Sequence, residues 1–253
     1  MWKHWKTFGL KEQRIAFSTI QSFPPSLFLD GIKEIALFAL HSKEINIPED
    51  DVTYIHFLTE ITQCVVVLTT NPLHLHDQDL FDSNVKIIAM SNRGLDFGLW
   101  SRFLIHYAKE MQQMHTLLLV NNSCSCIRSL KPIWEKNVQR PVWGITDSYE
   151  QKHHLQSYFV VIRTNVLIHK LLVFFEKNMF ETTTQRPLII EKGEVGLSQF
   201  LATETDIYAE YPFSELENPR NFSNPSYFLW KLLRKLNCPL IKKKKFKPMP
   251  EPR

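Results

Sequence analysis

Gln63-Cys64-Val65-Val66-Val67-Leu68-Thr69 is the stretch that decides the fold class. It is a short apolar run rich in β-branched side chains, and such runs favour a buried β-strand. The segment before it, residues 48–61, starts with Pro48-Glu49-Asp50-Asp51, and proline and acidic residues are typical of the first turn of a helix. A second apolar run, at residues 34–40, precedes that helix. Residues 34–69 therefore predict a strand, a helix and another strand in succession.

The same alternation continues toward the C-terminus. Further strands are predicted at residues 85–90, 116–120 and 141–145, and a long helix at residues 97–114. Extended segments at residues 158–162, 188–190 and 207–211 make the second half more mixed. Strands that alternate with long helices indicate βαβ units and a mostly parallel sheet. We therefore expect an α/β fold with a mostly parallel central sheet and a mixed C-terminal half.

Length and composition exclude several classes of protein. The chain has 253 residues, 44% of them hydrophobic and 12% aromatic, which suits one packed globular domain and not a disordered chain. Residues 35–40 are among the longest apolar runs, whereas a membrane-spanning helix needs roughly 20 apolar residues. Residues 1–21 carry charges throughout, unlike a secretory signal. The 4 cysteines are few and unevenly spaced, so we expect no disulfide framework and a reducing, cytoplasmic location.

The net charge of +4 is concentrated at the two ends of the chain. Residues 1–21 carry +3 and residues 242–253 carry +5, so that residues 22–241 carry −4. A mildly acidic body is unsuited to following a phosphate backbone, and we expect no nucleic-acid partner. Basic ends can instead bind an anionic membrane surface, or form a solubilising, disordered tail.

Small polar side chains follow the predicted strands. In an open α/β sheet, ligands bind beyond the carboxyl ends of the strands. The residues at those positions are His41-Ser42, Thr70-Asn71, residues 91–98, Asn121-Asn122-Ser123 and Thr146-Asp147-Ser148. Their chemistry suits a polyhydroxylated or phosphorylated ligand.

The familiar nucleotide-binding loops are absent from the sequence. There is no G-x-G-x-x-G after the first strand and no G-x-x-x-x-G-K-[ST], so we expect neither a dinucleotide nor any other redox cofactor. Only 7 glycines occur in the chain. Several of them lie in polar segments at strand ends or helix starts, namely Gly94, Gly98, Gly144, Gly193 and Gly196. Such placement suggests positive φ or close backbone approach, although loops also collect glycine.

A series of segments, in the same order along the chain, resembles the rhamnan synthesis F family. These segments are Ser91-Asn92-Arg93-Gly94-Leu95-Asp96-Phe97-Gly98-Leu99-Trp100, Leu119-Val120-Asn121-Asn122-Ser123, Trp143-Gly144-Ile145-Thr146-Asp147-Ser148-Tyr149, Leu155-Gln156-Ser157-Tyr158-Phe159, Glu194-Val195-Gly196-Leu197-Ser198-Gln199, Asn224-Pro225-Ser226-Tyr227 and Pro239-Leu240-Ile241-Lys242. The resemblance implies a GT-A-like nucleotide-sugar-binding fold. It also implies an inverting glycosyltransferase that moves a sugar, rhamnose, from a nucleoside-diphosphate donor to a growing cell-surface polysaccharide. A transferase that uses another nucleotide sugar, and a sugar-binding relative without catalysis, are the alternatives.

The resemblance implies that the donor binds at the carboxyl edge of the sheet. The implied donor-binding residues are His41, Ser42, Asn71, Asn92, Arg93, Gly94, Asp96, Asn121, Asn122 and Ser123. Asp96 could contact the ribose or a metal, or cap the helix that follows it. The family pattern after the fourth strand is usually Asn-Asp-Ser, and Asn122 replaces the acid here. An amide oxygen can ligate Mg²⁺ or Mn²⁺ but supplies no charge, so a metal held by Asn122 and Asp96 should matter less than in relatives with the acid.

Two carboxylates are candidates for catalysis. Glu194 is implied as the general base that takes the proton of the acceptor hydroxyl, although an acid also suits the start of a helix. Asp147 is the second candidate, either as a contact to the acceptor or donor sugar or as a turn residue. The candidate acceptor- or sugar-binding residues are Trp143, Thr146, His154, Gln156 and Tyr158. Of these, Trp143 and Tyr158 could equally be core aromatics.

The chain is expected to have three parts. Residues 1–24 form a basic, aromatic N-terminal helix or extension, residues 25–241 the glycosyltransferase-like domain and residues 242–253 a basic tail. The resemblance implies a lipid-linked glycan acceptor at the inner face of the membrane. The basic ends therefore suggest a cytoplasmic protein that is peripheral on that face.

Overall fold

The computed structural model describes residues 23–182, 185–216 and 224–243. Its strands are β1 (Glu34–Leu40), β2 (Cys64–Thr69), β3 (Val85–Ala89), β4 (Thr116–Asn121), β5 (Cys124–Cys126), β6 (Val142–Ser148), β7 (His154–Leu155), β8 (Phe159–Arg163), β9 (Ile207–Tyr211) and β10 (Leu240–Lys242). Its α-helices are α2 (Glu49–Thr59), α3 (Leu95–His106), α4 (Ala108–Met111), α5 (Lys131–Lys136), α6 (Asn165–Asn178), α7 (Arg186–Ile189), α8 (Gly196–Ala202), α9 (Pro225–Phe228) and α10 (Trp230–Lys235). Short 3₁₀ segments are η3 (Ser26–Leu29), η4 (Pro72–Leu80), η5 (Phe180–Thr182) and η7 (Phe213–Glu215), and η6 (Ile190–Val195) is a π-helix.

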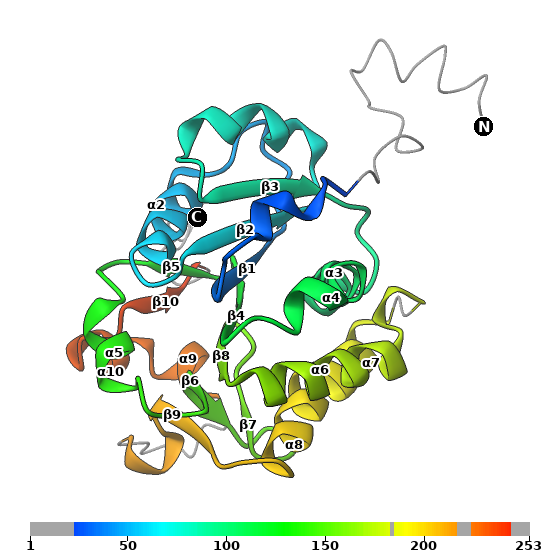
Figure 1. Ribbon diagram of the computed structural model, residues 1–253. Coiled ribbons are helices and arrows are strands. Elements are labelled where there is room, and N and C mark those ends of the chain that lie inside the picture. Colours follow the sequence, from blue (N-terminus) through cyan, green and yellow to red (C-terminus); the bar gives the residue numbers. More distant parts are fainter. Residues whose placement is uncertain (1–22, 183–184, 217–223, 244–253) are drawn as a thin grey trace.

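An eight-stranded sheet runs through the molecule in the order β3-β2-β1-β4-β8-β6-β7, with β9 paired to β6 (Figure 1). The strands β3, β2, β1 and β4 are parallel, whereas β8 is antiparallel to both β4 and β6. Because β8 reverses direction once, β6 again runs parallel to β4. The carboxyl ends of β1, β4 and β6 therefore lie at one edge of the sheet. The prediction of an α/β fold with a mostly parallel central sheet and a mixed second half is confirmed.

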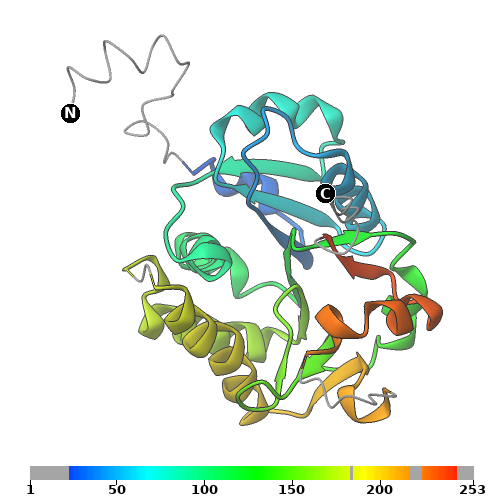
Figure 2. The same cartoon turned by 180° about the vertical axis from the view of Figure 1, so that it is seen from behind.

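Alternating side chains bury both faces of the sheet. In β1, Ile35, Leu37 and Ala39 belong to one core cluster, and Ala36, Phe38 and Leu40 belong to the other. The first cluster includes α3 and α6, and the second includes α2, α5 and α10. Figures 1 and 2 show these two groups of helices on opposite sides of the strands. Burial on both faces explains why β2 is a continuous apolar run and not an alternating one.

Helix α3 is fixed to the sheet and to the neighbouring helices near its N-terminus. Gly94, at the N-cap, has a φ of 75°. Six residues further on, the Trp100 indole Nε1 donates a hydrogen bond to the Leu37 carbonyl oxygen of β1 at 3.2 Å. These contacts set the position of the first turn of α3, which carries Asp96.

Three predicted elements differ from the structure. The helix at residues 97–114 is interrupted at Tyr107, whose φ of −100° and ψ of 29° leave the helical region between α3 and α4. Residues 188–190 were expected to be extended, but they lie in α7 and η6. That expectation is wrong because Pro187 starts a helix and a run of three apolar residues suits either structure. The strand predicted to end at residue 145 continues to Ser148, so Thr146 and Asp147 lie within β6.

All of the cysteines are buried free thiols, as predicted. Burial raises the pKa of the Cys64 thiol to about 11 and that of Cys238 to about 12. These thiols are therefore protonated at neutral pH and poor nucleophiles.

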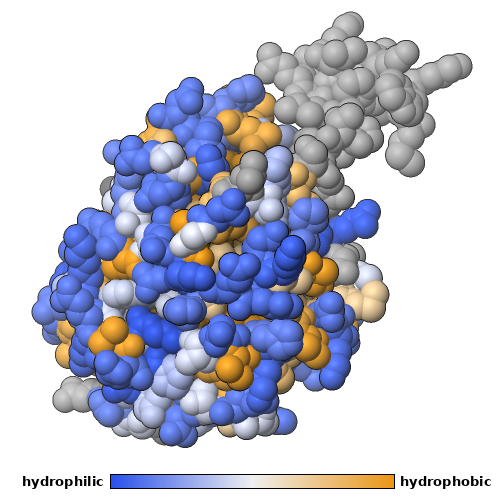
Figure 3. All heavy atoms as spheres, in the orientation of Figure 1, coloured by the Kyte–Doolittle hydropathy of each residue, from blue (hydrophilic) through white to orange (hydrophobic). Residues whose placement is uncertain are grey.

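The segments at the two ends of the chain lie mostly outside the described residues, which begin at residue 23 and end at residue 243. Lys242 is an exception to the predicted domain boundary, because it pairs with Cys124 in the antiparallel β5–β10 ladder and so belongs to the folded body. Within the described residues, no helix is both long enough and apolar enough to cross a lipid bilayer. The face drawn in Figure 3 is mostly hydrophilic, with hydrophobic residues in separate patches.

Lys243 forms an ion pair with a buried carboxylate. Its Nζ lies 2.5 Å from Oδ1 of Asp51 in α2, whose side chain has no exposed surface. Burial raises the pKa of Asp51 above its ordinary value even though the Lys243 ammonium opposes the rise. The pair therefore attaches the end of β10 to α2 and keeps a desolvated carboxylate neutralised.

Replacing Lys243 by methionine is expected to lower the free energy of unfolding by about 3 kcal/mol at neutral pH, because Asp51 would remain buried without its counter-ion. The folded-state pKa of Asp51 would rise further above its unfolded value. The loss should therefore shrink as the pH falls through that raised pKa, where Asp51 takes up a proton. Urea unfolding of the variant and the wild type between pH 7 and pH 4 measures this difference. The double variant Asp51→Asn/Lys243→Met should recover most of the loss, and an equal loss at every pH would contradict the assignment.

Candidate functional site

A partly enclosed cavity of about 290 Å³ lies at the carboxyl edge of the sheet. It is lined by Leu95, Asp96, Phe97, Asn121, Ser123, Glu150, Gln151, His154, Gln156, Ser157, Arg186, Ile189, Ile190, Glu194, Val195, Asn224 and Lys242. The sheet order changes direction at β1, whose neighbours are β2 and β4, and ligands of open α/β sheets bind at such switch points. The cavity is therefore placed where the fold class binds its ligands.

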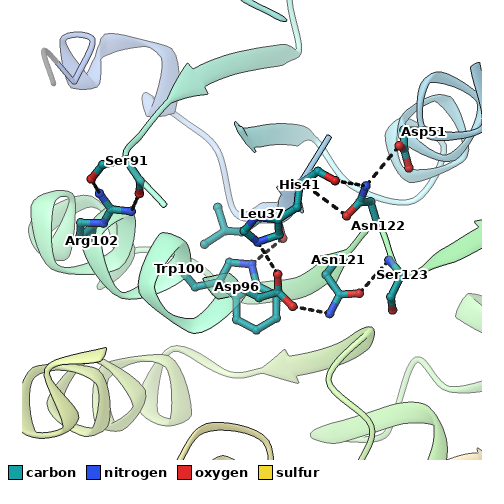
Figure 4. A network of polar contacts seen from close by, with 10 residues as sticks. All are labelled: Leu37, His41, Asp51, Ser91, Asp96, Trp100, Arg102, Asn121, Asn122 and Ser123. Atoms are coloured by element: carbon teal, nitrogen blue, oxygen red, sulfur yellow. Dashed lines mark hydrogen bonds and ion pairs between the residues drawn. The ribbon is translucent and has the colours of Figure 1, made fainter. Parts of the chain in front are cut away.

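A polar network connects the ends of β1 and β4 with the start of α3 (Figure 4). The carboxylate of Asp96 lies 2.7 Å from Nε2 of His41 through Oδ1, and its Oδ2 accepts a hydrogen bond from the Asn121 amide at 2.8 Å. The Asn121 side-chain oxygen in turn accepts the backbone N–H of Ser123 at 3.1 Å. Asp96 lies in the first turn of α3, whose N-cap is Gly94, so its predicted alternative role as the cap is wrong. The network instead holds Asp96, Asn121 and Ser123 together in the cavity wall.

Asn122 does not line the cavity. Its side-chain oxygen accepts the backbone N–H of His41 at 3.2 Å, and its amide donates to Oδ2 of Asp51 at 3.4 Å (Figure 4). Because the side chain at position 122 does not line the cavity, the replacement of the family's acid by Asn122 leaves the charge of the cavity lining unchanged. It joins the end of β1 to α2.

The predicted metal ligands do not fit a divalent cation in this arrangement. Asn122 is directed toward Asp51, and both oxygens of Asp96 already interact with His41 and Asn121. In the described part of the chain, no group of three or more His, Cys, Asp or Glu side chains is arranged to hold a metal ion. Mg²⁺ and Mn²⁺ prefer several oxygen ligands, carboxylates among them, and the cavity does not gather such a set.

Glu194 reaches the cavity from the π-helix η6. Its Oε1 accepts the backbone N–H of Ser157 at 2.9 Å, and no hydrogen bond to Oε2 is found among the described residues. A Cβ added to Gly193 would lie 2.7 Å from the Phe97 ring, so glycine lets η6 lie directly against the start of α3. π-Helices are rare and frequently occur at functional sites. Glu194 thus lines the cavity with one of its oxygens anchored to the backbone of Ser157.

Two cations in the cavity wall were missed by the sequence analysis as site residues. Lys242 donates from Nζ to the Ser123 hydroxyl at 3.0 Å and lies 4.6 Å from the centre of the Tyr158 ring. Arg186 is exposed at the start of α7, and no hydrogen bond or ion pair of its side chain with the described residues is found. Lys242 is the final residue of the last segment that resembles the family. The sequence does not distinguish it as a site residue, because it stands in a run of lysines.

A chain of hydrogen bonds supports the polar floor of the cavity. The Tyr158 hydroxyl lies 2.7 Å from the Thr146 hydroxyl, which donates to the side-chain oxygen of Gln156 at 2.6 Å. The Gln156 amide donates to Asn224, whose own amide donates to Glu150. Burial raises the pKa of Tyr158 well above its ordinary value, so its hydroxyl stays neutral. Gln156, Asn224 and Glu150 are the members of this chain that line the cavity, whereas the Thr146 hydroxyl, bonded to Tyr158, orients the Gln156 side chain from the core.

Two predicted sugar contacts are core aromatics. Trp143 has no exposed surface and packs against Trp134 and Phe159. Tyr158 is 2% exposed and belongs to the same core cluster. The interpretation of either ring as a platform for a sugar is wrong, because a ring that a ligand stacks on must present one face to the cavity.

Asp147 is buried and fully engaged away from the cavity. Its Oδ2 lies 2.8 Å from Nε2 of His153, and its Oδ1 accepts the backbone N–H of Phe213 at 2.6 Å. These contacts attach the end of β6 to the loop before β7 and to η7. The expectation that Asp147 contacts a substrate is therefore corrected to a role in holding these loops.

The remaining predicted donor residues lie in other surroundings. Ser42, Asn71 and Asn92 line a separate open groove of about 580 Å³ at the carboxyl ends of β1, β2 and β3. The Asn71 side chain is itself used in the fold, because its amide donates to the Glu44 carbonyl and its oxygen accepts the Leu73 backbone N–H. The same edge of the sheet thus carries two neighbouring depressions.

Arg93 and Gly94 precede α3 and line neither depression. Arg93 is exposed, and Gly94 is buried against Phe180. His154 does line the cavity, and its Nδ1 lies 2.7 Å from the Lys152 carbonyl oxygen. Of the predicted site residues, the structure therefore gathers Asp96, Asn121, Ser123, His154, Gln156 and Glu194 around one cavity.

A family model for rhamnan synthesis protein F matches residues 65–250. The chain belongs to this family. The matched range contains every residue that lines the cavity, from Leu95 to Lys242. Membership in the rhamnan synthesis protein F family thus confirms the resemblance drawn from the sequence motifs.

Comparisons with curated proteins and with solved structures are less informative than the family match. No curated protein matches the chain. HddC from Yersinia pseudotuberculosis is similar at 11% sequence identity and a TM-score of 0.38, over 54% of this chain and 79% of that chain. A 4-diphosphocytidyl-2C-methyl-D-erythritol synthase is similar at 12% identity and a TM-score of 0.42, over 75% of this chain and 93% of that chain.

Proposed function

We propose that this protein is an inverting glycosyltransferase with a GT-A-like fold. In this proposal it moves rhamnose from a nucleoside-diphosphate donor to a growing cell-surface polysaccharide. Membership in the rhamnan synthesis protein F family supports the choice of sugar and product. The observation that carries the proposal is the cavity itself. It combines Glu194, a carboxylate with one oxygen free of hydrogen bonds to the described residues, with the polar group Asp96, Asn121 and Ser123 at the sheet edge.

The donor is proposed to lie along the carboxyl edge. Asp96, Asn121 and Ser123 offer carboxylate, amide and hydroxyl groups to the donor in the cavity. The neighbouring groove of Ser42, Asn71 and Asn92 extends the same edge and offers room for the nucleoside. His41 supports this arrangement by fixing the Asp96 carboxylate.

In the proposed reaction, the free oxygen of Glu194 takes the proton of the acceptor hydroxyl. The hydroxyl oxygen then forms a bond to the anomeric carbon as the bond from that carbon to the diphosphate oxygen breaks. The electron pair of the broken bond leaves with the nucleoside diphosphate. This single displacement inverts the anomeric configuration and needs the reactants held in line.

The acceptor is proposed to be a lipid-linked glycan. His154 and Gln156 lie in the cavity wall and offer hydrogen bonds to a sugar hydroxyl. The basic segments at residues 1–21 and 244–253, which lie outside the described residues, are proposed to bring the protein to the anionic inner face of the membrane.

Isothermal titration with a panel of nucleotide sugars, including nucleotide-activated rhamnose, tests the proposal. We expect one member to bind with a Kd of about 1 μM to 1 mM. Asp96→Asn should weaken that binding about tenfold, because it removes a charged hydrogen-bond acceptor from the cavity. The control variant Asp82→Asn changes an exposed aspartate outside the cavity and should bind like the wild type.

The other outcomes distinguish the alternatives. Binding of a different nucleotide sugar would change the donor but keep the reaction. Binding without release of nucleoside diphosphate on any acceptor would favour a sugar-binding relative without catalysis. If no member of the panel binds, the proposed function is wrong.

A further inference from the structure

The proposed donor brings negative charge into the cavity, and this charge needs a positive partner. A leaving nucleoside diphosphate carries negative charge that something must neutralise, and the predicted metal ligands do not converge on a metal position. We propose that Lys242, assisted by Arg186, supplies this positive charge directly, so that the donor diphosphate binds without a divalent metal. This inference rests on the proposed function, because it concerns the same donor.

The register of β10 delivers Lys242 to the cavity. Ile241 pairs with Ser125 and Lys242 with Cys124, which places Lys242 beside Ser123 in the turn between β4 and β5. The next backbone N–H, that of Lys243, donates to the Ser123 carbonyl oxygen at 3.1 Å. Successive side chains of an extended chain point to opposite sides, and accordingly Lys242 enters the cavity wall while Lys243 binds Asp51. The ion pair of Lys243 thus fixes the strand that presents Lys242.

The carboxylates of the cavity all have donors of their own. Asp96 receives His41 and Asn121, and Glu194 receives the Ser157 backbone N–H. Glu150 receives the amide of Asn224. The partners of Asp96 and Glu194 among the described residues include no lysine or arginine.

The cations, by contrast, have no acidic partner among the described residues. Among the described residues, the Lys242 ammonium contacts only the Ser123 hydroxyl and the face of the Tyr158 ring, which hold it in place without neutralising it. The Arg186 guanidinium has no hydrogen-bond or ion-pair partner among the described residues, and its planar shape suits two phosphate oxygens at once. Neither cation is therefore neutralised by a direct ion pair with the described residues, and both attract an anionic ligand at the cavity.

Titration calorimetry with UDP, dTDP and GDP as probes, in EDTA and in MnCl₂, tests the inference. The wild type should bind one of them with the same Kd, within about twofold, in both solutions. Lys242→Met should weaken binding at least about tenfold in both, because it deletes a charged hydrogen bond to phosphate. Lys242→Arg should recover most of the affinity. Arg186→Gln should weaken binding in the same direction without affecting folding, since the Arg186 side chain is exposed and has no hydrogen-bond or ion-pair partner among the described residues.

The controls separate this inference from the proposed function. Lys109→Gln removes an exposed lysine of α4 outside the cavity and should leave the Kd unchanged. Binding that requires Mn²⁺, or that is unaffected by Lys242→Met and Arg186→Gln, would overturn the inference and leave the proposed function standing. If none of the three nucleoside diphosphates binds in either solution, the proposed function itself fails.

Discussion

Replacing Glu194 by glutamine is expected to lower the rate of sugar transfer by about 10²–10⁴-fold, which is the usual contribution of a general base. Glutamine keeps the shape of the side chain and can still accept the Ser157 backbone N–H through its amide oxygen. It cannot take a proton from the acceptor hydroxyl. Donor affinity and the melting temperature should therefore change little, and parallel turnover, calorimetric and thermal measurements establish the contrast.

The matched control for this variant is Glu191→Gln. Glu191 lies on the same π-helix as Glu194, but it is exposed and does not line the cavity. It should retain wild-type turnover. A Glu194→Gln enzyme that keeps most of its turnover would exclude Glu194 as the base.

Gly94→Ala is expected to lower the free energy of unfolding by about 2–4 kcal/mol. A Cβ at this position would lie 2.4 Å from the Phe180 carbonyl oxygen, and the backbone has a positive φ of 75°. The obstacle is backbone, which cannot move aside as a flexible side chain could. Since Gly94 caps the helix that carries Asp96, donor affinity should fall as well. Chemical denaturation of the purified variants measures the stability loss.

Gly31→Ala separates backbone strain from collision. Gly31 has nearly the same φ, 76°, but no atom lies within 4 Å of its added Cβ. It should lose only about 1 kcal/mol, the cost of placing a side chain in the left-handed region. Equal losses for the two variants would show that contact with Phe180 does not matter.

The fold was predictable where burial leaves a strong pattern. The β-branched run of β2 and the acidic start of α2 each have one structural explanation, and both elements are found. Residues 188–190 are too short a segment to distinguish a strand from a helix, because three apolar side chains pack equally well from either. β6 pairs with β9 although the two strands are far apart in the sequence, and no local sequence pattern predicts such a pairing.

The candidate site was predictable in its location but not in its cations. Polar residues after the strands marked the edge where Asp96, Asn121 and Ser123 meet. Side chains alternate between the two sides of an extended strand, so the sequence already indicated that Asn121 and Ser123 point to one side and Asn122 to the other. Lys242 could not be told from its lysine neighbours, because only the pairing of β10 with β5 selects it.

A crystal structure with the bound nucleotide sugar is the most direct test of the proposed function. We expect the diphosphate to lie against Lys242 and Arg186, with the anomeric carbon of the sugar facing Oε2 of Glu194. A nucleotide sugar bound elsewhere, for instance in the depression beside Glu60 and Trp134, with the cavity free of ligand, would contradict it.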